Sequence, residues 1–252
     1  MTTKIALITG ASRGLGKNAA LALAKAGHDL VITYHSQADA AAAVVREIES
    51  LGRKAVALQL DTSNIAGFAD FSQQLTTVLQ RHWLRDHFDY LVNNAGTGMH
   101  TAISDTTAQQ FDAMVNVHLK GVFFLTQTLL PQLNDGGAIL NLSSGLARFS
   151  LPGYAAYAMM KGGIEVFSRY LALELGPRRI RVNTLAPGAI ETDFGGGAVR
   201  DNAGLNQLIA SQTALGRVGL PDDIGGAVVT LLSEQSGWIN GQRIEASGGI
   251  HL

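Results

Sequence analysis

Short runs of apolar and β-branched residues alternate with longer amphipathic stretches along the whole chain. A short apolar run between turn residues predicts a strand, and apolar positions every three or four residues predict a helix. This alternation is typical of βαβ units, whose strands form a parallel sheet covered by helices. The predicted strands are residues 5–9, 30–34, 55–60, 90–94, 138–143, 181–187 and 242–247.

Glycines and one polar pair mark where the intervening helices end and begin. Gly27 and Gly52 each follow an amphipathic stretch and are predicted to end its helix. Thr107 and Gln110 predict a capping box for a helix that continues through residues 115–130. That helix is apolar on nearly all sides, which favours burial, and contact with another subunit would explain it.

The weakest pattern lies after the sixth predicted strand. Residues 194–207 are rich in glycine and lack a clear period. Because loops often carry binding residues, a mobile substrate loop is expected around residues 193–215.

Composition favours one soluble domain with small-molecule partners. Hydrophobic residues make up 46% of the 252 residues, enough for the core of a single domain spanning residues 1–252. The 19 Lys and Arg residues balance 20 Asp and Glu residues, which disfavours nucleic acid and membrane surfaces as partners. The first ten residues lack a secretory signal and no apolar run reaches about 18 residues, so a cytoplasmic protein is expected.

Metal sites and disulfides are not expected. The chain has no cysteine, which excludes thiolate ligands and leaves the redox compartment open. The seven histidines are scattered, and even His82 and His87 lack the spacing of a helical ligand pair.

A glycine-rich turn follows the first predicted strand and opens the first helix. In residues 9–16, TGASRGLG, the glycines at positions 10, 14 and 16 would let a pyrophosphate approach the backbone. Free N–H groups and the helix dipole would favour the anion there. The spacing differs from the commonest dinucleotide fingerprint, and a turn without a ligand is the alternative.

The stretch YAAYAMMKGG, residues 154–163, sets two tyrosines before one lysine. In a helix, both Tyr154 and Tyr157 point in nearly the same direction as Lys161. At about 1.5 Å rise per residue, Tyr157 lies roughly 6 Å from Lys161 along the axis and Tyr154 roughly 10 Å, so Tyr157 is the candidate partner. An ordinary surface pair is the alternative.

Together these motifs resemble the single-domain branch of the short-chain dehydrogenase/reductase family. The resemblance rests on the glycine turn, NNAG at 93–96, YxxxK at 157–161, Pro187-Gly188 and the tail WINGQRIEASGG, and its nearest type is the 3-oxoacyl-carrier-protein reductase. It implies a doubly wound Rossmann fold, with seven parallel strands, helices on both faces and a nicotinamide cofactor. It also implies a homotetramer built on the fourth and fifth helices and the C-terminal segment.

The cofactor is expected to be NADP(H) rather than NAD(H). An NAD site needs a carboxylate after the second strand, whereas this strand ends in Tyr34-His35-Ser36. Arg13 stands where NADP enzymes of the family often carry a base, although it could be an exposed loop cation.

The resemblance implies cofactor contacts along the whole edge of the sheet. Asp61 would meet the adenine or only cap a helix, and Asn93 would lie beside the cofactor or only hold a turn. The implied cofactor-binding residues are Gly10, Ser12, Arg13, Gly14, Leu15, Gly16, His35, Ser36, Asp61, Thr62, Asn93, Ala95, Gly96, Tyr157, Lys161, Pro187, Gly188, Ile190 and Thr192.

Ketone reduction needs a hydride and a proton, and Tyr157 is the expected acid and base. Its ordinary pKa of about 10 must fall by about 3 units, and a Lys161 ammonium at roughly 4.5 Å would supply the roughly 4 kcal/mol required. The resemblance gives Lys161 a second role in holding the ribose hydroxyls of the cofactor.

Two further catalytic residues are implied by the resemblance. Ser144, 13 positions before Tyr157, would hold the carbonyl oxygen, whereas Ser143 should face the other side of the strand. Asn116 would bind a water that relays protons to Lys161, and an Asn in an apolar helix needs such an explanation.

The substrate side is largely apolar, and its residues could equally be core. Arg148 is the polar exception. The expected lining is Gly98, Met99, Leu146, Phe149, Leu151, Tyr154 and the loop after Thr192.

The expected function is interconversion of a ketone and a secondary alcohol on a free small molecule. A 3-oxoacyl-carrier-protein reductase is the alternative, but Leu173 stands where an arginine for the acidic carrier is expected. Arg178, Arg179 and Arg181 lie nearby without clearly sharing a face. A non-catalytic dinucleotide-binding protein is a more remote alternative.

Overall fold

The protein forms a seven-stranded parallel sheet, described by a computed structural model over residues 3–252. Its strand order is β3-β2-β1-β4-β5-β6-β7, so the topology reverses between β1 and β4. In such sheets ligands bind beyond the carboxyl ends of the strands, at this reversal. The strands are β1 (Ile5–Ile8), β2 (Asp29–Tyr34), β3 (Ala55–Gln59), β4 (Phe88–Asn93), β5 (Leu133–Leu142), β6 (Arg181–Pro187) and β7 (Arg243–Ala246).

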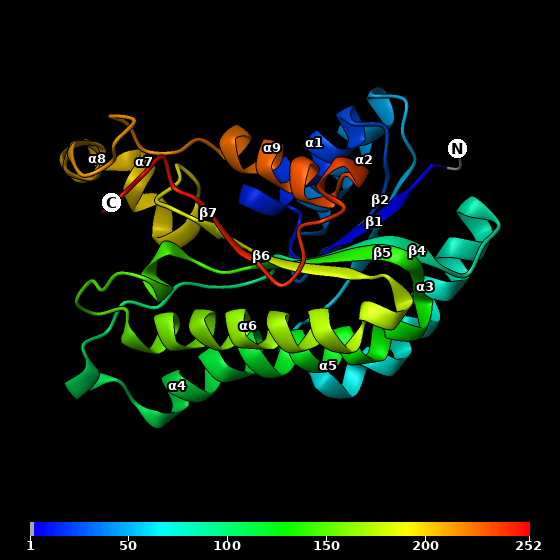
Figure 1. Ribbon diagram of the computed structural model, residues 1–252, viewed down its shortest axis with the longest axis horizontal. Helices are drawn as coiled ribbons and strands as arrows, with labels where there is room; N and C mark the ends of the chain where they lie inside the picture. Colours follow the sequence, from blue (N-terminus) through cyan, green and yellow to red (C-terminus); the bar gives the residue numbers. More distant parts are fainter. Residues whose placement is uncertain (1–2) are drawn as a thin grey trace.

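Helices cover both faces of the sheet (Figure 1). Residues of α1, α2 and α9 form one buried cluster with the sheet, and residues of α3, α5 and α6 form the other. The expected doubly wound fold is therefore confirmed. The helices are α1 (Gly14–Lys25), α2 (Ala38–Ser50), α3 (Phe68–Trp83), α4 (Ala108–Val115), α5 (Gly121–Leu129), α6 (Ala155–Glu174), α7 (Ala198–Asp201), α8 (Ala203–Ser211) and α9 (Pro221–Leu232).

The helix predicted to follow Thr107 is interrupted rather than uniform. The capping box between Thr107 and Gln110 is present at the start of α4. A π-helical segment, Asn116–Lys120, then joins α4 to α5. Gly121, which follows this segment, lies so close to the carbonyl of Thr62 that a side chain would overlap it. The π-helical segment thus ends at the point where the helix comes closest to the backbone after β3.

The segment expected to be a mobile loop contains the short helices α7 and α8, and its mobility stays a prediction. Within residues 3–252, no helix is long and apolar enough to cross a membrane. Nor do three or more His, Asp or Glu side chains of that range gather as ligands for a metal ion.

Candidate active site

Helix α6 brings Tyr157 and Lys161 together at the carboxyl edge of the sheet. Both are buried, with 7% of Tyr157 and 6% of Lys161 exposed. The Nζ of Lys161 is 5.6 Å from the centre of the Tyr157 ring. It also donates a hydrogen bond of 2.8 Å to the carbonyl of Leu142, the last residue of β5. Tyr154 precedes the first helical residue, so Tyr157 is the tyrosine that Lys161 adjoins.

The end of β5 points two adjacent serines in opposite directions. Ser143 donates a hydrogen bond of 2.7 Å to Glu165, away from Tyr157. The Ser144 hydroxyl instead accepts a hydrogen bond of 3.2 Å from the N–H of Leu146 and lies near enough to Tyr157 to lower the pKa of its phenol. This is the alternation of an extended strand, and it puts the Ser144 hydroxyl beside the proton-carrying group.

Burial controls the titration of this centre. It raises the pKa of Tyr157 to about 12, and the nearby Ser144 hydroxyl lowers that pKa by less. Burial also lowers the pKa of Lys161 to about 8. The predicted lowering of the Tyr157 pKa is therefore not found, because removing the phenolate charge from water is the larger effect. Tyr157 therefore keeps its proton at neutral pH.

The structure brings His118, rather than Asn116, against Tyr157. Asn116 opens the π-helical segment, and its side chain forms no hydrogen bond with any residue from 3 to 252. His118 is 1% exposed, and its ring stands perpendicular to Tyr157 with the centres 5.5 Å apart. Asn116 and His118 are two residues apart in this segment, so their side chains point to different sides of the helix.

His118 is neutral and has one unused acceptor. Its Nε2 lies 2.8 Å from the carbonyl of Thr97, which requires a proton on Nε2. Burial, with a smaller effect from Lys161, lowers the pKa of His118 to about 3. Nδ1 is then an unprotonated acceptor, buried and without a partner among the described residues. Sequence reasoning missed His118, although it stands in the same apolar helix.

The glycine turn after β1 is held closely by its neighbours. Gly10 and Gly14 have φ angles of 65° and 57°, which favour glycine. A side chain at Gly16 would lie 2.5 Å from the Asn94 amide and from the carbonyl of Gly10. Asn94 donates to the carbonyls of Thr9 and Gly10, at 2.8 and 3.1 Å. Asn94 belongs to the quoted NNAG motif but was not singled out.

The start of α1 fits the pyrophosphate of a dinucleotide. No side chain from residues 3–252 caps this helix, so its first N–H groups are free for an anion. A side chain added at Gly14 would meet nothing within 4 Å. A cavity of about 280 Å³ joins this turn to the segment after β6. Its lining residues are Gly14, Lys17, Asn18, Leu21, Glu191, Thr192, Asp193, Arg200 and Pro221.

The expected adenosine end is exposed and carries a free cation. Arg13, His35 and Ser36 are all exposed, and Arg13 makes no ion pair with residues 3–252. Asp61 accepts hydrogen bonds from the N–H and hydroxyl of Ser63, at 2.9 and 2.7 Å, so it holds a turn rather than capping a helix. The other expected contacts of this end, Ser12, Leu15 and Thr62, are half-buried.

The Asn93 side chain does not face the expected cofactor site. It donates to Thr126 at 3.1 Å and to Asn141 at 2.8 Å, and Asn141 donates to Ser168 at 2.9 Å. These four side chains are buried between the sheet and helices α5 and α6. Strand alternation turns the Asn93 side chain to the opposite side from that of Asn94, and the expected place of Asn93 beside the cofactor stays a prediction.

The expected nicotinamide contacts gather at the ends of β4 and β6. A side chain at Gly96 would lie 2.7 Å from the His118 ring, and one at Gly188 would lie 2.9 Å from Ser247. Both positions therefore need the close approach that only glycine allows. The expected contacts found at these strand ends are Ala95, Gly96, Pro187, Gly188, Ile190 and Thr192.

On the substrate side, the segment after β6 brings the ring of Phe194 close to Tyr157. Their ring centres are 5.9 Å apart. Met99 and Leu146 pack against a buried cluster of Met114, Tyr157 and Met160, whereas Leu151 is 45% exposed. Their place in a substrate pocket stays a prediction. From the sequence, Phe194 is expected among the substrate-lining residues only as part of the loop after Thr192. A single aromatic residue among glycines is the only feature that could have singled it out.

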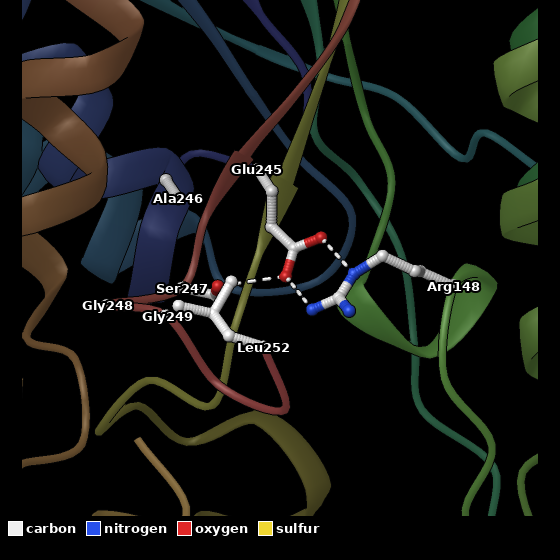
Figure 2. Close-up of a pocket in the computed structure, with 7 residues that line it drawn as sticks. All are labelled: Arg148, Glu245, Ala246, Ser247, Gly248, Gly249 and Leu252. Atoms are coloured by element: carbon white, nitrogen blue, oxygen red, sulfur yellow. Dashed lines mark hydrogen bonds and ion pairs between the residues drawn. The ribbon is translucent and has the colours of Figure 1, made fainter. Parts of the chain in front are cut away.

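Arg148 is bound by the C-terminal tail and is not free to meet a substrate. Figure 2 shows its guanidinium paired with Glu245, through contacts of 2.7 and 2.8 Å. It also donates to the carbonyls of Ile250 and His251, at 2.8 and 3.0 Å. A cavity of about 400 Å³ adjoins this pair, lined by Arg148, Glu245, Ala246, Ser247, Gly248, Gly249 and Leu252.

The chain is similar to known reductases over nearly its full length. A family model described as enoyl-(acyl carrier protein) reductase matches residues 10–251. An uncharacterized oxidoreductase of Methylorubrum extorquens is 37% identical over 247 residues, covering 98% of this chain and 97% of the relative. Tetrahydroxynaphthalene reductase PfmaG of Pestalotiopsis fici is 37% identical over 257 aligned residues, covering 98% of this chain and 91% of the relative.

Solved structures show the same architecture. The promiscuous reductase LugOII, which catalyses keto-reduction at C1 during lugdunomycin biosynthesis, aligns with a TM-score of 0.94 and 36% identity, covering 100% of this chain and 99% of its own. The angucycline C-6 ketoreductase LanV with bound NADP aligns with a TM-score of 0.92 and 36% identity, covering 98% and 95%. Fold, motifs and relatives agree, and the chain belongs to the short-chain dehydrogenase/reductase family.

Proposed function

We propose that the protein is an NADP(H)-dependent oxidoreductase that interconverts a ketone and a secondary alcohol on a free small molecule. The observation that carries the proposal is the meeting of Ser144, Tyr157 and Lys161 at the same carboxyl edge of the sheet as the uncapped start of α1. A hydroxyl, a protonated phenol and an ammonium in one buried place suit proton transfer to a carbonyl oxygen. The names of the relatives, which include reductases and ketoreductases, agree with this.

The roles of the three groups follow from their hydrogen-bonding chemistry. When bound, NADPH supplies the hydride. Ser144 donates a hydrogen bond to the substrate oxygen, and Tyr157 gives its proton to that oxygen as negative charge develops. The raised pKa of Tyr157, about 12, keeps the phenol protonated at neutral pH, as proton donation to a substrate oxygen requires. Lys161, pointing to the same edge, holds the ribose hydroxyls and supports reprotonation of Tyr157.

Charge at the adenosine end supports NADP(H) over NAD(H). Arg13 is exposed and free of ion pairs within residues 3–252, so it can meet a 2′-phosphate. The carboxylate of Asp61 lies on the neighbouring strand end and is engaged by Ser63. LanV, which is similar over nearly the full chain, has NADP bound.

Of the three arginines that could meet an acidic carrier protein, Arg178 and Arg181 are engaged internally and only Arg179 is exposed, which disfavours the carrier-linked alternative. Arg178 donates to the carbonyls of Leu130 and Leu133, at 2.9 and 2.5 Å. Arg181 donates to the carbonyl of Leu231 at 3.0 Å and to two others. Leu173 is 77% exposed where a cation would be needed.

An apolar face on α5 and α6 supports a homotetramer. Phe123 and Phe167 lie with ring centres 4.9 Å apart on this face. Next to them are residues whose exposure is large for apolar side chains, Val166 at 45%, Tyr170 at 63% and Leu173 at 77%. Exposed apolar patches of this kind mark association surfaces.

The proposal is tested by following NADPH absorbance with a panel of free ketones, each also assayed with NADH. We expect turnover with NADPH and a lower kcat/KM with NADH. Arg13→Glu should reduce the preference for NADPH. Equal or better rates with NADH would overturn the cofactor assignment, and turnover only of carrier-bound substrates would overturn the substrate assignment.

A further inference from the structure

Aromatic rings reach the carboxyl edge of the sheet from four neighbouring strands. Strands β4 to β7 lie side by side in the sheet, and each is followed by a segment that supplies one ring. The start of α6 supplies two tyrosines. We call these residues the aromatic cluster: His100, Phe149, Tyr154, Tyr157, Phe194 and His251.

The cluster consists of three ring pairs. Pairs at centre distances of about 4.5–7 Å with inclined planes are attractive. The centres are 5.9 Å apart in Phe194 and Tyr157, 4.9 Å in His100 and Tyr154, and 4.6 Å in Phe149 and His251. Because the pairs join segments from different strands, they arise from the tertiary fold.

A glycine faces one ring of every pair. An added side chain would lie 2.9 Å from Phe194 at Gly98, 2.5 Å from His100 at Gly153, and 2.8 Å from Phe149 at Gly145. Real side chains do not approach this closely, so any other residue would displace the ring. The backbone is thus shaped around the rings.

The charged groups near the cluster neutralise one another. Arg148 is paired with Glu245, and Arg243 pairs with both Glu165 and Glu245. Arg200, beyond Phe194, is held by Asp193 and Asp201. These three arginines are therefore not available to pair with a carboxylate or phosphate of a substrate. The remaining cation beside the cluster, within residues 3–252, is Lys161.

Phe194 is the adjustable member of the cluster. It is 49% exposed, whereas its partner Tyr157 is buried. The three following residues, Gly195, Gly196 and Gly197, have φ angles of 62°, 75° and 79°. Such a run can change its backbone angles at little steric cost, so the ring can adapt to a ligand lying against Tyr157.

We propose that the substrate is a neutral ketone fused to a flat aromatic ring system, and that Phe194 is a specificity-determining residue that stacks on it. The inference rests on the proposed function, since the carbonyl must reach Tyr157. An aromatic ligand lying against Tyr157 gains from inclined or offset contact with the Phe194 ring, and a neutral one needs no counter-ion. A saturated ketone of the same size gains only the contact area.

The test compares 2-tetralone with 2-decalone, which share a bicyclic skeleton but differ in aromaticity. With NADPH we expect a kcat/KM about 10-fold higher for 2-tetralone. Phe194→Leu should lower kcat/KM for 2-tetralone by about 3- to 10-fold, mainly through KM, and leave 2-decalone within about twofold. Phe194→Tyr should restore the preference. Trp238→Leu, which removes a fully exposed ring elsewhere, is the matched control and should change neither substrate.

Three outcomes would overturn the inference. Equal kcat/KM for both ketones in the wild type would do so while leaving the proposed function intact. An equal loss for both ketones in Phe194→Leu would show a merely structural role for the ring. Failure to reduce 2-tetralone, while another free ketone is reduced with NADPH, would overturn the inference and leave the proposed function intact.

Discussion

Lys161 is buried, and burial makes its ammonium charge unfavourable because the charge is removed from water. Burial lowers its pKa to about 8 from an ordinary value near 10.5, so the fold disfavours the ammonium. The hydrogen bond to the Leu142 carbonyl satisfies one of its three donors. A cation kept in such a place at neutral pH is explained by function rather than by stability.

Replacing Lys161 should therefore stabilise the protein while abolishing activity. We expect Lys161→Met to raise the free energy of unfolding at pH 7 by about 1–3 kcal/mol. Between about pH 8 and 10.5 the unfolded wild type binds a proton at this lysine that the folded protein does not, so wild-type stability should rise with pH there. Urea unfolding of both proteins at pH 7 and 9.5 measures this. A variant less stable at pH 7, with the same pH dependence as the wild type, would refute the assignment.

Among the elements, the polar network around Asn93 joins β4, β5, α5 and α6. Asn93→Leu would leave the Asn141 carbonyl oxygen without its donor. We expect a loss of about 1–3 kcal/mol in unfolding free energy, with the NADPH dissociation constant within about twofold. Asn94→Leu is the matched control, since Asn94 braces the glycine turn. It should weaken NADPH binding, as measured by fluorescence titration.

The reverse pattern would contradict the assignment of these two asparagines. If Asn93→Leu weakened NADPH binding with unchanged stability, its side chain would belong to the cofactor site after all. If Asn94→Leu left binding unchanged, the turn would not depend on this amide.

The strands were predictable because each is a short apolar run bounded by turn residues. All seven predicted strands overlap observed ones. The largest boundary error is at β5, which begins at Leu133 because Leu133 pairs with Phe88 across an irregularity in register. That pairing depends on a strand about 45 residues earlier, which no local pattern contains.

The candidate site was predictable where spacing along one element decided it. The pairing of Tyr157 with Lys161 follows from helix rise. Ser144 follows from the 13-residue spacing that the family resemblance implies, and strand alternation turns Ser143 to the other face. The orientation of the Asn93 and Asn116 side chains could not be predicted, because it depends on tertiary structure: the buried network in one case and the π-helical segment in the other. Their expected roles, beside the cofactor and in the proton relay, stay predictions. The prediction of a lowered pKa for Tyr157 was wrong, because the sequence spacing of Tyr157 and Lys161 does not show how deeply the phenol is buried.

At the scale of the whole molecule, the exposed apolar face of α5 and α6 is expected to be an interface between subunits. We expect the wild type to be a tetramer by light scattering at micromolar concentration. Tyr170→Asp combined with Leu173→Asp places charges on this face and should lower the mass of the assembly. Leu84→Asp, at a residue 92% exposed after α3, is the control and should leave the mass unchanged. A monomeric wild type would refute the proposal.

The central claim is that Tyr157 gives the proton in an NADPH-dependent ketone reduction, and Tyr157→Phe tests it most directly. The change removes one hydroxyl and keeps the ring that contacts His118 and Phe194. We predict that kcat falls by about 10²- to 10⁴-fold, while NADPH binding stays within about twofold. Tyr154→Phe, which tests the other tyrosine, should keep kcat within about tenfold. Unchanged turnover in Tyr157→Phe, on any ketone that the wild type reduces, would contradict the account.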